Sequence, residues 1–87
     1  MKLKLKGSEA AAGTSSTNGS NVGLATLVRV HNAGTTERLV TLETVANVTI
    51  GTFTIAGGAT ELLDKTSTDE VFAANAEVKL VGIAYYS

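Results

Sequence analysis

Residues 48–55 read Val-Thr-Ile-Gly-Thr-Phe-Thr-Ile and have the strongest β-strand composition in the chain. β-Branched and aromatic residues fill the stretch, and such side chains fit the pleated surface of a sheet. The apolar side chains form two pairs, Val48 with Ile50 and Phe53 with Ile55, whose alternation slips by one residue near Gly51. A β-bulge there would return both pairs to the core, because a bulge adds one residue to one strand of a pair. The stretch therefore predicts a bulged strand in a β-sheet fold.

Two further strands are expected before this stretch. Residues 24–31 and residues 37–43 are rich in β-branched and apolar side chains. Between them lies Asn32-Ala33-Gly34, and asparagine and glycine accept the positive φ angles that tight turns need. We therefore expect the two strands to form a hairpin.

The part of the chain that follows is expected to hold two strands and one short helical turn. Gly57-Gly58 predicts a tight hairpin turn into a strand over residues 60–65. Residues 67–70 match the Ser-x-x-Glu capping box, which predicts a short helical turn over residues 71–74. The last strand, residues 78–86, is apolar on both faces, so we expect it to be central or covered on each side.

Short strands at this close spacing are typical of a small antiparallel β-sandwich or barrel. We expect an all-β fold of six to seven short strands, with Phe53 and Phe72 in its core. The chain of 87 residues has room for one such domain.

The N-terminal part has a different character from the rest. Residues 2–6 alternate lysine with leucine, so a strand there would carry Lys2, Lys4 and Lys6 on one face, as exposed edge strands often do. Residues 7–21 are small and polar and bury too little to offset their own ordering. We therefore divide the chain into residues 1–21, an edge strand with a flexible arm, and residues 22–87, the β-sandwich domain.

Composition excludes several classes of function. The net charge of −1 leaves no basic excess for nucleic-acid phosphates, so nucleic acid is not an expected partner. No stretch approaches the roughly 20 apolar residues that span a bilayer, so a membrane is not expected either. The chain has no cysteine, a single histidine and no recognisable catalytic or nucleotide-binding motif. We expect neither enzyme activity nor a cofactor or metal.

Two isolated groups allow a second interpretation. His31 is expected to be an ordinary polar residue at a strand end, with a metal or base role as the alternative. Asp64, Asp69 and Glu70 lie within seven residues, so a Ca²⁺ site is conceivable, although turn and capping chemistry explain them better.

Partner binding is the chemistry that the sequence favours. The lysine face of residues 2–6 could contact an acidic surface or a neighbouring sheet edge. Tyr85 and Tyr86 carry an apolar ring with a polar tip, which is typical of contact surfaces. The candidate partner-binding residues are Lys2, Lys4, Lys6, Tyr85 and Tyr86.

The region from residue 24 to residue 87 resembles the small structural proteins of tailed phages that infect cyanobacteria and other marine bacteria. The resemblance rests on a turn of the form Asn-x-Gly-Thr-Thr over residues 32–36 and a Lys-x-x-Thr-Asp turn over residues 65–69. A glycine-turn hairpin lies between them, and the chain closes with a Val-x-x-x-x-Ile-Ala-Tyr strand.

The resemblance implies a virion component, assembled in the host cytoplasm, with the major capsid protein or other virion proteins as partners. Our first hypothesis is a capsid decoration or cement protein that binds the outside of the head, as a homo-oligomer such as a trimer, and stabilises contacts between major capsid subunits. The alternative is a neck, tail or fibre component that attaches to proteins or to the host surface. A cellular β-sandwich interaction module is a third hypothesis.

Overall fold

The computed structural model describes residues 2–86, and the side chains of residues 2–85. It confirms the all-β sandwich, with eight strands where the sequence predicts six or seven. The strands are β1 (Lys2–Leu5), β2 (Ala10–Ala11), β3 (Leu27–Asn32), β4 (Arg38–Glu43), β5 (Thr49–Ile55), β6 (Thr60–Asp64), β7 (Glu70–Ala73) and β8 (Val78–Tyr86). One turn of 3₁₀ helix, η1 (Ser16–Asn18), lies between β2 and β3.

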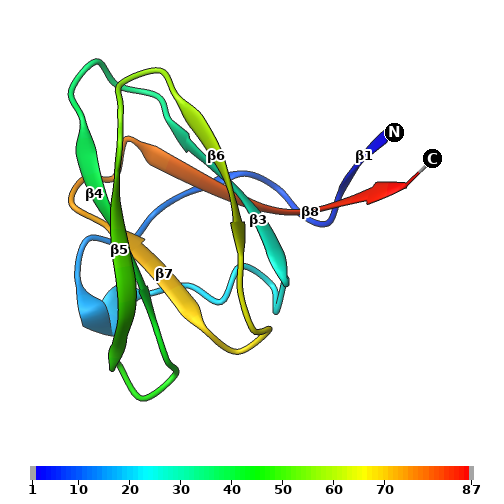
Figure 1. Ribbon diagram of the computed structural model, residues 1–87, viewed down its shortest axis with the longest axis horizontal. Coiled ribbons are helices and arrows are strands. Elements are labelled where there is room, and N and C mark those ends of the chain that lie inside the picture. The colour runs from blue at the N-terminus through cyan, green and yellow to red at the C-terminus, as the bar shows by residue number, and fades with distance from the viewer. Residues whose placement is uncertain (1, 87) are drawn as a thin grey trace.

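The strands form two antiparallel sheets (Figure 1). The larger sheet has the order β1-β8-β3-β6, with β2 also paired to β8, and the smaller sheet has the order β5-β4-β7. β8 is central, with β3 along one edge and β1 and β2 along the other. This confirms the expectation drawn from its two apolar faces.

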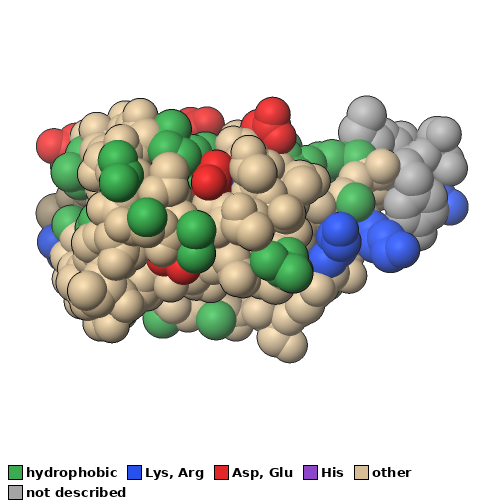
Figure 2. All heavy atoms as spheres, turned by 90° about the horizontal axis from the view of Figure 1, so that it is seen from below, with side chains coloured by type: hydrophobic (Ala, Val, Ile, Leu, Met, Phe, Trp, Pro, Cys, Tyr) green, Lys and Arg blue, Asp and Glu red, His purple; other side chains and the backbone are tan. Residues whose placement is uncertain are grey.

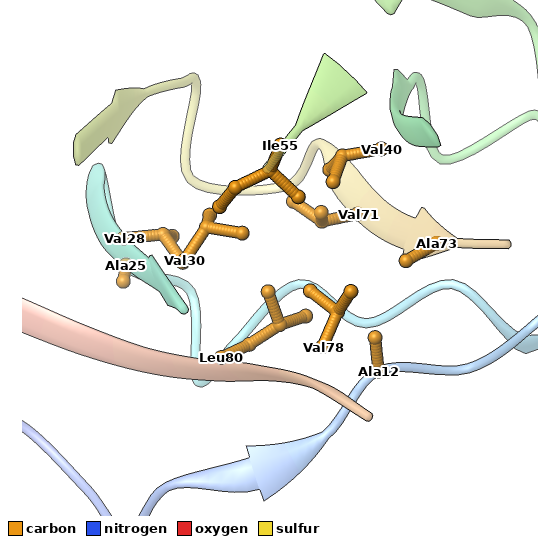
Figure 3. Close-up of a cluster of buried hydrophobic side chains, with 10 residues drawn as sticks. All are labelled: Ala12, Ala25, Val28, Val30, Val40, Ile55, Val71, Ala73, Val78 and Leu80. Atoms are coloured by element: carbon orange, nitrogen blue, oxygen red, sulfur yellow. The ribbon is translucent and has the colours of Figure 1, made fainter. Parts of the chain in front are cut away.

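The core lies between the two sheets and is built from small aliphatic side chains (Figure 3). Val28 and Val30 of β3 and Leu80 of β8 face Val40 and Val71 of the smaller sheet. The prediction that both phenylalanines lie in the core is confirmed in part for Phe53 only. Phe53 is partly buried and packs against this cluster, whereas Phe72 alternates with buried Val71 and Ala73 and so lies on the opposite face of its strand.

The expected hairpin between β3 and β4 is not formed, because the two strands belong to different sheets. Asn32 is fully buried at this crossing, where its side-chain amide donates to the carbonyls of Thr36 (2.8 Å) and Ile55 (3.1 Å). Its side-chain oxygen accepts from the backbone N–H of Gly34 at 3.0 Å. Asn32 therefore stabilises a corner between sheets rather than a two-stranded turn.

Gly57-Gly58 forms the second crossing between sheets, beside the first, so the predicted hairpin turn is also wrong. The backbone N–H of Gly58 donates to the carbonyl of Asn32 at 2.9 Å, and that of Asn32 donates to the carbonyl of Ala59 at 3.0 Å. A Cβ atom on Gly57 would lie 2.5 Å from the carbonyl carbon of Thr35. The two crossings therefore pack too closely for any side chain at this position.

The hairpin that does form joins β4 to β5 through residues 44–48. The strand register shifts between Leu42, opposite Gly51, and Glu43, opposite Thr49, so a β-bulge lies close to the predicted position. The bulge does not return Val48 and Ile50 to the core, because both side chains stay exposed. That part of the prediction is wrong.

Residues 70–73 form strand β7 instead of the expected helical turn. The backbone N–H of Asp69 donates to the carbonyl of Thr66 at 3.0 Å, which closes a turn just before the strand. Pairing with β4 along the whole of β7 gives Val71 and Ala73 buried positions, so tertiary packing outweighs the local capping signal.

The N-terminal residues lie along both sheets. Ala12 is buried in the core and its N–H donates to the carbonyl of Val78 at 2.8 Å, while Ser20 pairs with Val71 of the smaller sheet. Ser16 donates to a carboxylate oxygen of buried Glu43 at 2.5 Å, and the other oxygen of that carboxylate has no partner among the described residues. The backbone of the expected arm thus follows the sandwich, and its mobility in solution stays a prediction.

Replacing Asn32 with alanine should destabilise the fold strongly. The substitution leaves buried backbone groups without partners at the crossing between the sheets, so we expect the free energy of unfolding to fall by about 2–4 kcal/mol in urea titrations. Asn21→Ala is the matched control, because Asn21 is exposed and its side chain accepts one bond from the N–H of Leu24 at 3.3 Å. Equal losses in the two variants would contradict this role for Asn32.

Candidate functional site

The two ends of the described chain form a two-stranded ribbon that projects from the sandwich (Figure 1). Its strands are β1 and the last four residues of β8, with Leu3 opposite Tyr85 and Leu5 opposite Ile83. β3 pairs with β8 only as far as Gly82, so beyond that residue β1 is the only strand beside β8. A two-stranded ribbon is marginally stable by itself in water, so this element gains most from a further strand.

One face of the ribbon is apolar. Leu5 is 63% exposed, Leu3 47% and Tyr85 41%, although all three lie on the same face as buried Ile83. An open groove of about 570 Å³ runs beneath the two leucines toward Val81. Exposed leucines beside such a groove are typical of a surface that another protein covers.

The opposite face of the ribbon is basic. Lys4 lies opposite Ala84, and Lys2 and Lys6 follow on the same side by the alternation of the strand. All three lysines are exposed, and Figure 2 shows basic side chains gathered at the end of the molecule where the termini lie. The ribbon is therefore apolar on one face and positively charged on the other.

The ribbon and Lys6, the residue directly after β1, contain all five residues that the sequence singles out for partner binding. Lys2, Lys4 and Lys6 share one face, and Tyr85 lies on the other with Leu3 and Leu5. The backbone of Tyr86 pairs with Lys2, while the side chain of Tyr86 lies outside the described part. From the sequence, the two leucines were placed only on the face of an edge strand opposite the lysines, and nothing in the local sequence shows that they lack a covering layer.

Residues 7–9 connect the ribbon to the body of the sandwich. Glu9 accepts from the Arg29 guanidinium at 3.0 Å, and both side chains line the groove of the ribbon. Because the pair is largely exposed, its contribution to stability is small, about 1 kcal/mol or less. Its effect is to hold residues 7–9 over the outer face of the larger sheet.

A second apolar surface lies at the tip of the β4–β5 hairpin, residues 44–50, which we call the hairpin tip. Val45, Val48 and Ile50 are 67%, 61% and 52% exposed. Figure 1 shows this loop at the bottom of the view, on the other side of the body from the two termini. We did not predict this surface from the sequence. The slip in alternation near Gly51 was the available signal that Val48 and Ile50 face away from the core. We interpreted it instead as a β-bulge that returns both side chains to the core.

His31 and Asp69, two of the remaining candidate residues, lie beside local structural partners. A ring nitrogen of His31 lies 2.8 Å from the hydroxyl oxygen of Thr60 on the neighbouring strand. Beside Asp69 lies the buried Lys65, which donates to the carbonyls of Thr66 and Ser67. Burial lowers the pKa of Lys65, and the negative charge of Asp69 opposes this shift. A lysine ammonium therefore occupies the turn for which Ca²⁺ was the alternative.

Hydrogen exchange should divide β8 into two parts. Residues 78–82 pair with β3, and residues 79–80 also with β2, whereas residues 83–86 pair with β1 alone among the described strands. We expect amides of the ribbon to exchange at least about tenfold faster than those of residues 78–82, because the ribbon can open without unfolding the core. The measurement is amide exchange by NMR on the whole chain. Equal protection along β8 would show that the ribbon is as stable as the body.

Within residues 2–86, no helix is long and apolar enough to cross a membrane. In the same part of the chain, no group of three or more His, Cys, Asp and Glu side chains is placed to hold a metal ion. No family model, curated protein or solved structure matches this chain.

Proposed function

We propose that this protein is a non-enzymatic structural subunit of a phage virion, a decoration or cement protein that binds the outside of the capsid. The observation that carries the proposal is the pair of exposed apolar surfaces, the ribbon and the hairpin tip, which lie on opposite sides of the molecule in the plane of its two longer axes, 35 and 31 Å. A protein that joins neighbouring subunits needs two separate contact surfaces, and this arrangement supplies them.

The size of these surfaces suits an assembly of many copies. Each surface exposes only a few large side chains, so one copy gains little binding free energy from either contact. Copies held at symmetry-related sites add their contacts, and the second contact of a bound copy forms at a high effective concentration. Strong attachment therefore follows from repetition, without a deep binding pocket.

The hairpin tip is the surface that we assign to the capsid shell. Its three exposed side chains are β-branched, so they lose little conformational freedom when a partner covers them. The hairpin extends from β4, the central strand of the smaller sheet, which gives the tip a rigid support.

Charged residues at the hairpin tip should abolish capsid binding. We expect the double variant Val45→Asp/Val48→Asp to lose at least about tenfold in apparent affinity, because two charges would have to be buried at the contact. The measurement is co-pelleting with heads that lack this protein, at several salt concentrations. Leu24→Asp is the matched control, since Leu24 is 56% exposed and lies in the turn before β3.

The outcomes of this experiment separate the hypotheses. Co-pelleting of the unaltered protein that saturates at a fixed ratio to the major capsid protein, and its loss in the tip variant alone, would support the cement function. Failure of the unaltered protein to bind heads would reject it and direct the search to the neck, tail or fibre. Equal losses in the tip variant and the control would reject the assignment of the hairpin tip.

A further inference from the structure

The larger sheet ends in two open edges, which offer complementary surfaces. β1 pairs only with β8, and β6 pairs only with β3. Each outer edge therefore presents backbone N–H and C=O groups that a strand from another chain can pair with. We propose that these edges join copies of this protein head to tail, with β1 of one copy added beside β6 of the next.

The charges of the two edges select this pairing. β1 and the residue after it carry Lys2, Lys4 and Lys6, whereas β6 carries Glu61 and Asp64, and all five side chains are exposed. Pairing of β1 with β1, or of β6 with β6, brings like charges together, and like charges directly opposite on paired strands are destabilising. Only β1 against β6 brings opposite charges together. Repulsion at the alternative pairings is a common source of specificity.

The alternation of side chains agrees with the charge of Glu61, whereas Asp64, opposite Leu27, lies on the outer side of β6 with Leu62. Glu61 lies opposite Val30, whose side chain is in the core, so Glu61 is on the inner side of the sheet and Leu62 on the outer side. Lys4 lies opposite Ala84 of β8. Side chains two positions apart on a strand share a face, so Ala84 lies on the same inner side as Gly82 and the core residue Leu80. The lysines are therefore also on the inner side. In a sheet continued across two copies, lysines therefore meet Glu61, while Leu3 and Leu5 meet Leu62.

The direction of the strands also agrees. Every neighbouring pair in the larger sheet is antiparallel, so β1 runs parallel to β3 and β6 runs parallel to β8. If the next copy continues the sheet with the same strand order and orientation, its β1 runs antiparallel to β6. The joined sheet would thus be antiparallel throughout.

The shape of the molecule leaves room for this contact. β1 projects beyond the body, so it can reach a neighbouring copy (Figure 1). Along the edge of β6 an open groove of about 380 Å³ is lined by Phe53 and Thr54 of β5 and by residues 61–63. The added strand would cover this groove together with Leu62, which is 49% exposed.

A head-to-tail contact uses a different surface on each copy, so it generates a closed ring or an open filament. The hairpin tip takes no part in it and remains free for the capsid contact proposed above. The inference therefore goes beyond the proposed function and stands or falls separately from it, because self-association is measured without heads.

The test uses light scattering after size-exclusion chromatography on the full chain over a wide range of protein concentration. One variant reverses the charges of the β1 edge with Lys2→Glu, Lys4→Glu and Lys6→Glu. The other variant reverses the charges of the β6 edge with Glu61→Lys and Asp64→Lys. We expect the unaltered protein to associate, and each reversal to raise the dissociation constant at least about tenfold. Glu37→Lys, an exposed charge reversal between β3 and β4, should leave association unchanged.

The decisive sample is an equimolar mixture of the two reversed variants. Its components carry opposite charges at both kinds of contact, so association should return in the mixture and give species that contain both variants. A merely structural effect of the substitutions would not produce this rescue. A monomeric unaltered protein, association that neither reversal weakens, or a mixture that stays dissociated would each overturn the proposal.

Discussion

The structure depends on one constraint, that β8 is apolar on both faces and must be covered on both. Its inner face, with Val78 and Leu80, meets the smaller sheet across the valine-rich core. Its outer face carries Val81 and Ile83, which are 3% and 2% exposed although no second sheet lies on that side. Burying two large aliphatic side chains contributes about 3–6 kcal/mol, so covering the outer face matters to the whole domain.

The N-terminal residues lie where the outer face needs cover. Leu5 is opposite Ile83, and residues 7–9 lie over the groove near Val81, where Glu9 bonds Arg29. The leucines that approach this face remain exposed themselves, Leu3 by 47% and Leu5 by 63%, so the cover is incomplete. The same residues that complete the fold are thus the ones that remain available to another protein. This connects the stability of β8 with the proposed role in assembly.

At the end of the sandwich away from the ribbon, the two crossings between the sheets pack closely because they bond each other. There the chain passes between the sheets twice, at residues 32–37 and at residues 56–59, and the two passages bond each other through Asn32 and Gly58. Asn32 replaces the backbone partners that a hairpin would have supplied, and Gly57 allows the passages to touch. The smaller sheet is held over the larger one by these contacts as well as by the core.

Much of the secondary structure could be predicted from the sequence, because alternation of apolar and polar residues depends on neighbours two positions apart. The strands at residues 49–55 and 78–86 are examples, and so is the lysine strand that carries three of the candidate contact residues. The partners of these strands could not be predicted in the same way. Asn-x-Gly and Gly-Gly indicate a turn but do not indicate whether the chain returns to its own sheet or crosses to the other.

The sequence by itself determined the all-β class, the central strand with two apolar faces and the set of charged and aromatic residues at the two ends of the chain. Only the tertiary structure decided that these ends lie side by side as a projecting ribbon, that residues 70–73 extend along β4 instead of turning into a helix, and that Val48 and Ile50 stay exposed. The physical reason is that burial and strand pairing depend on residues far apart in the chain. Local patterns cannot specify which surfaces are covered once the two sheets have packed.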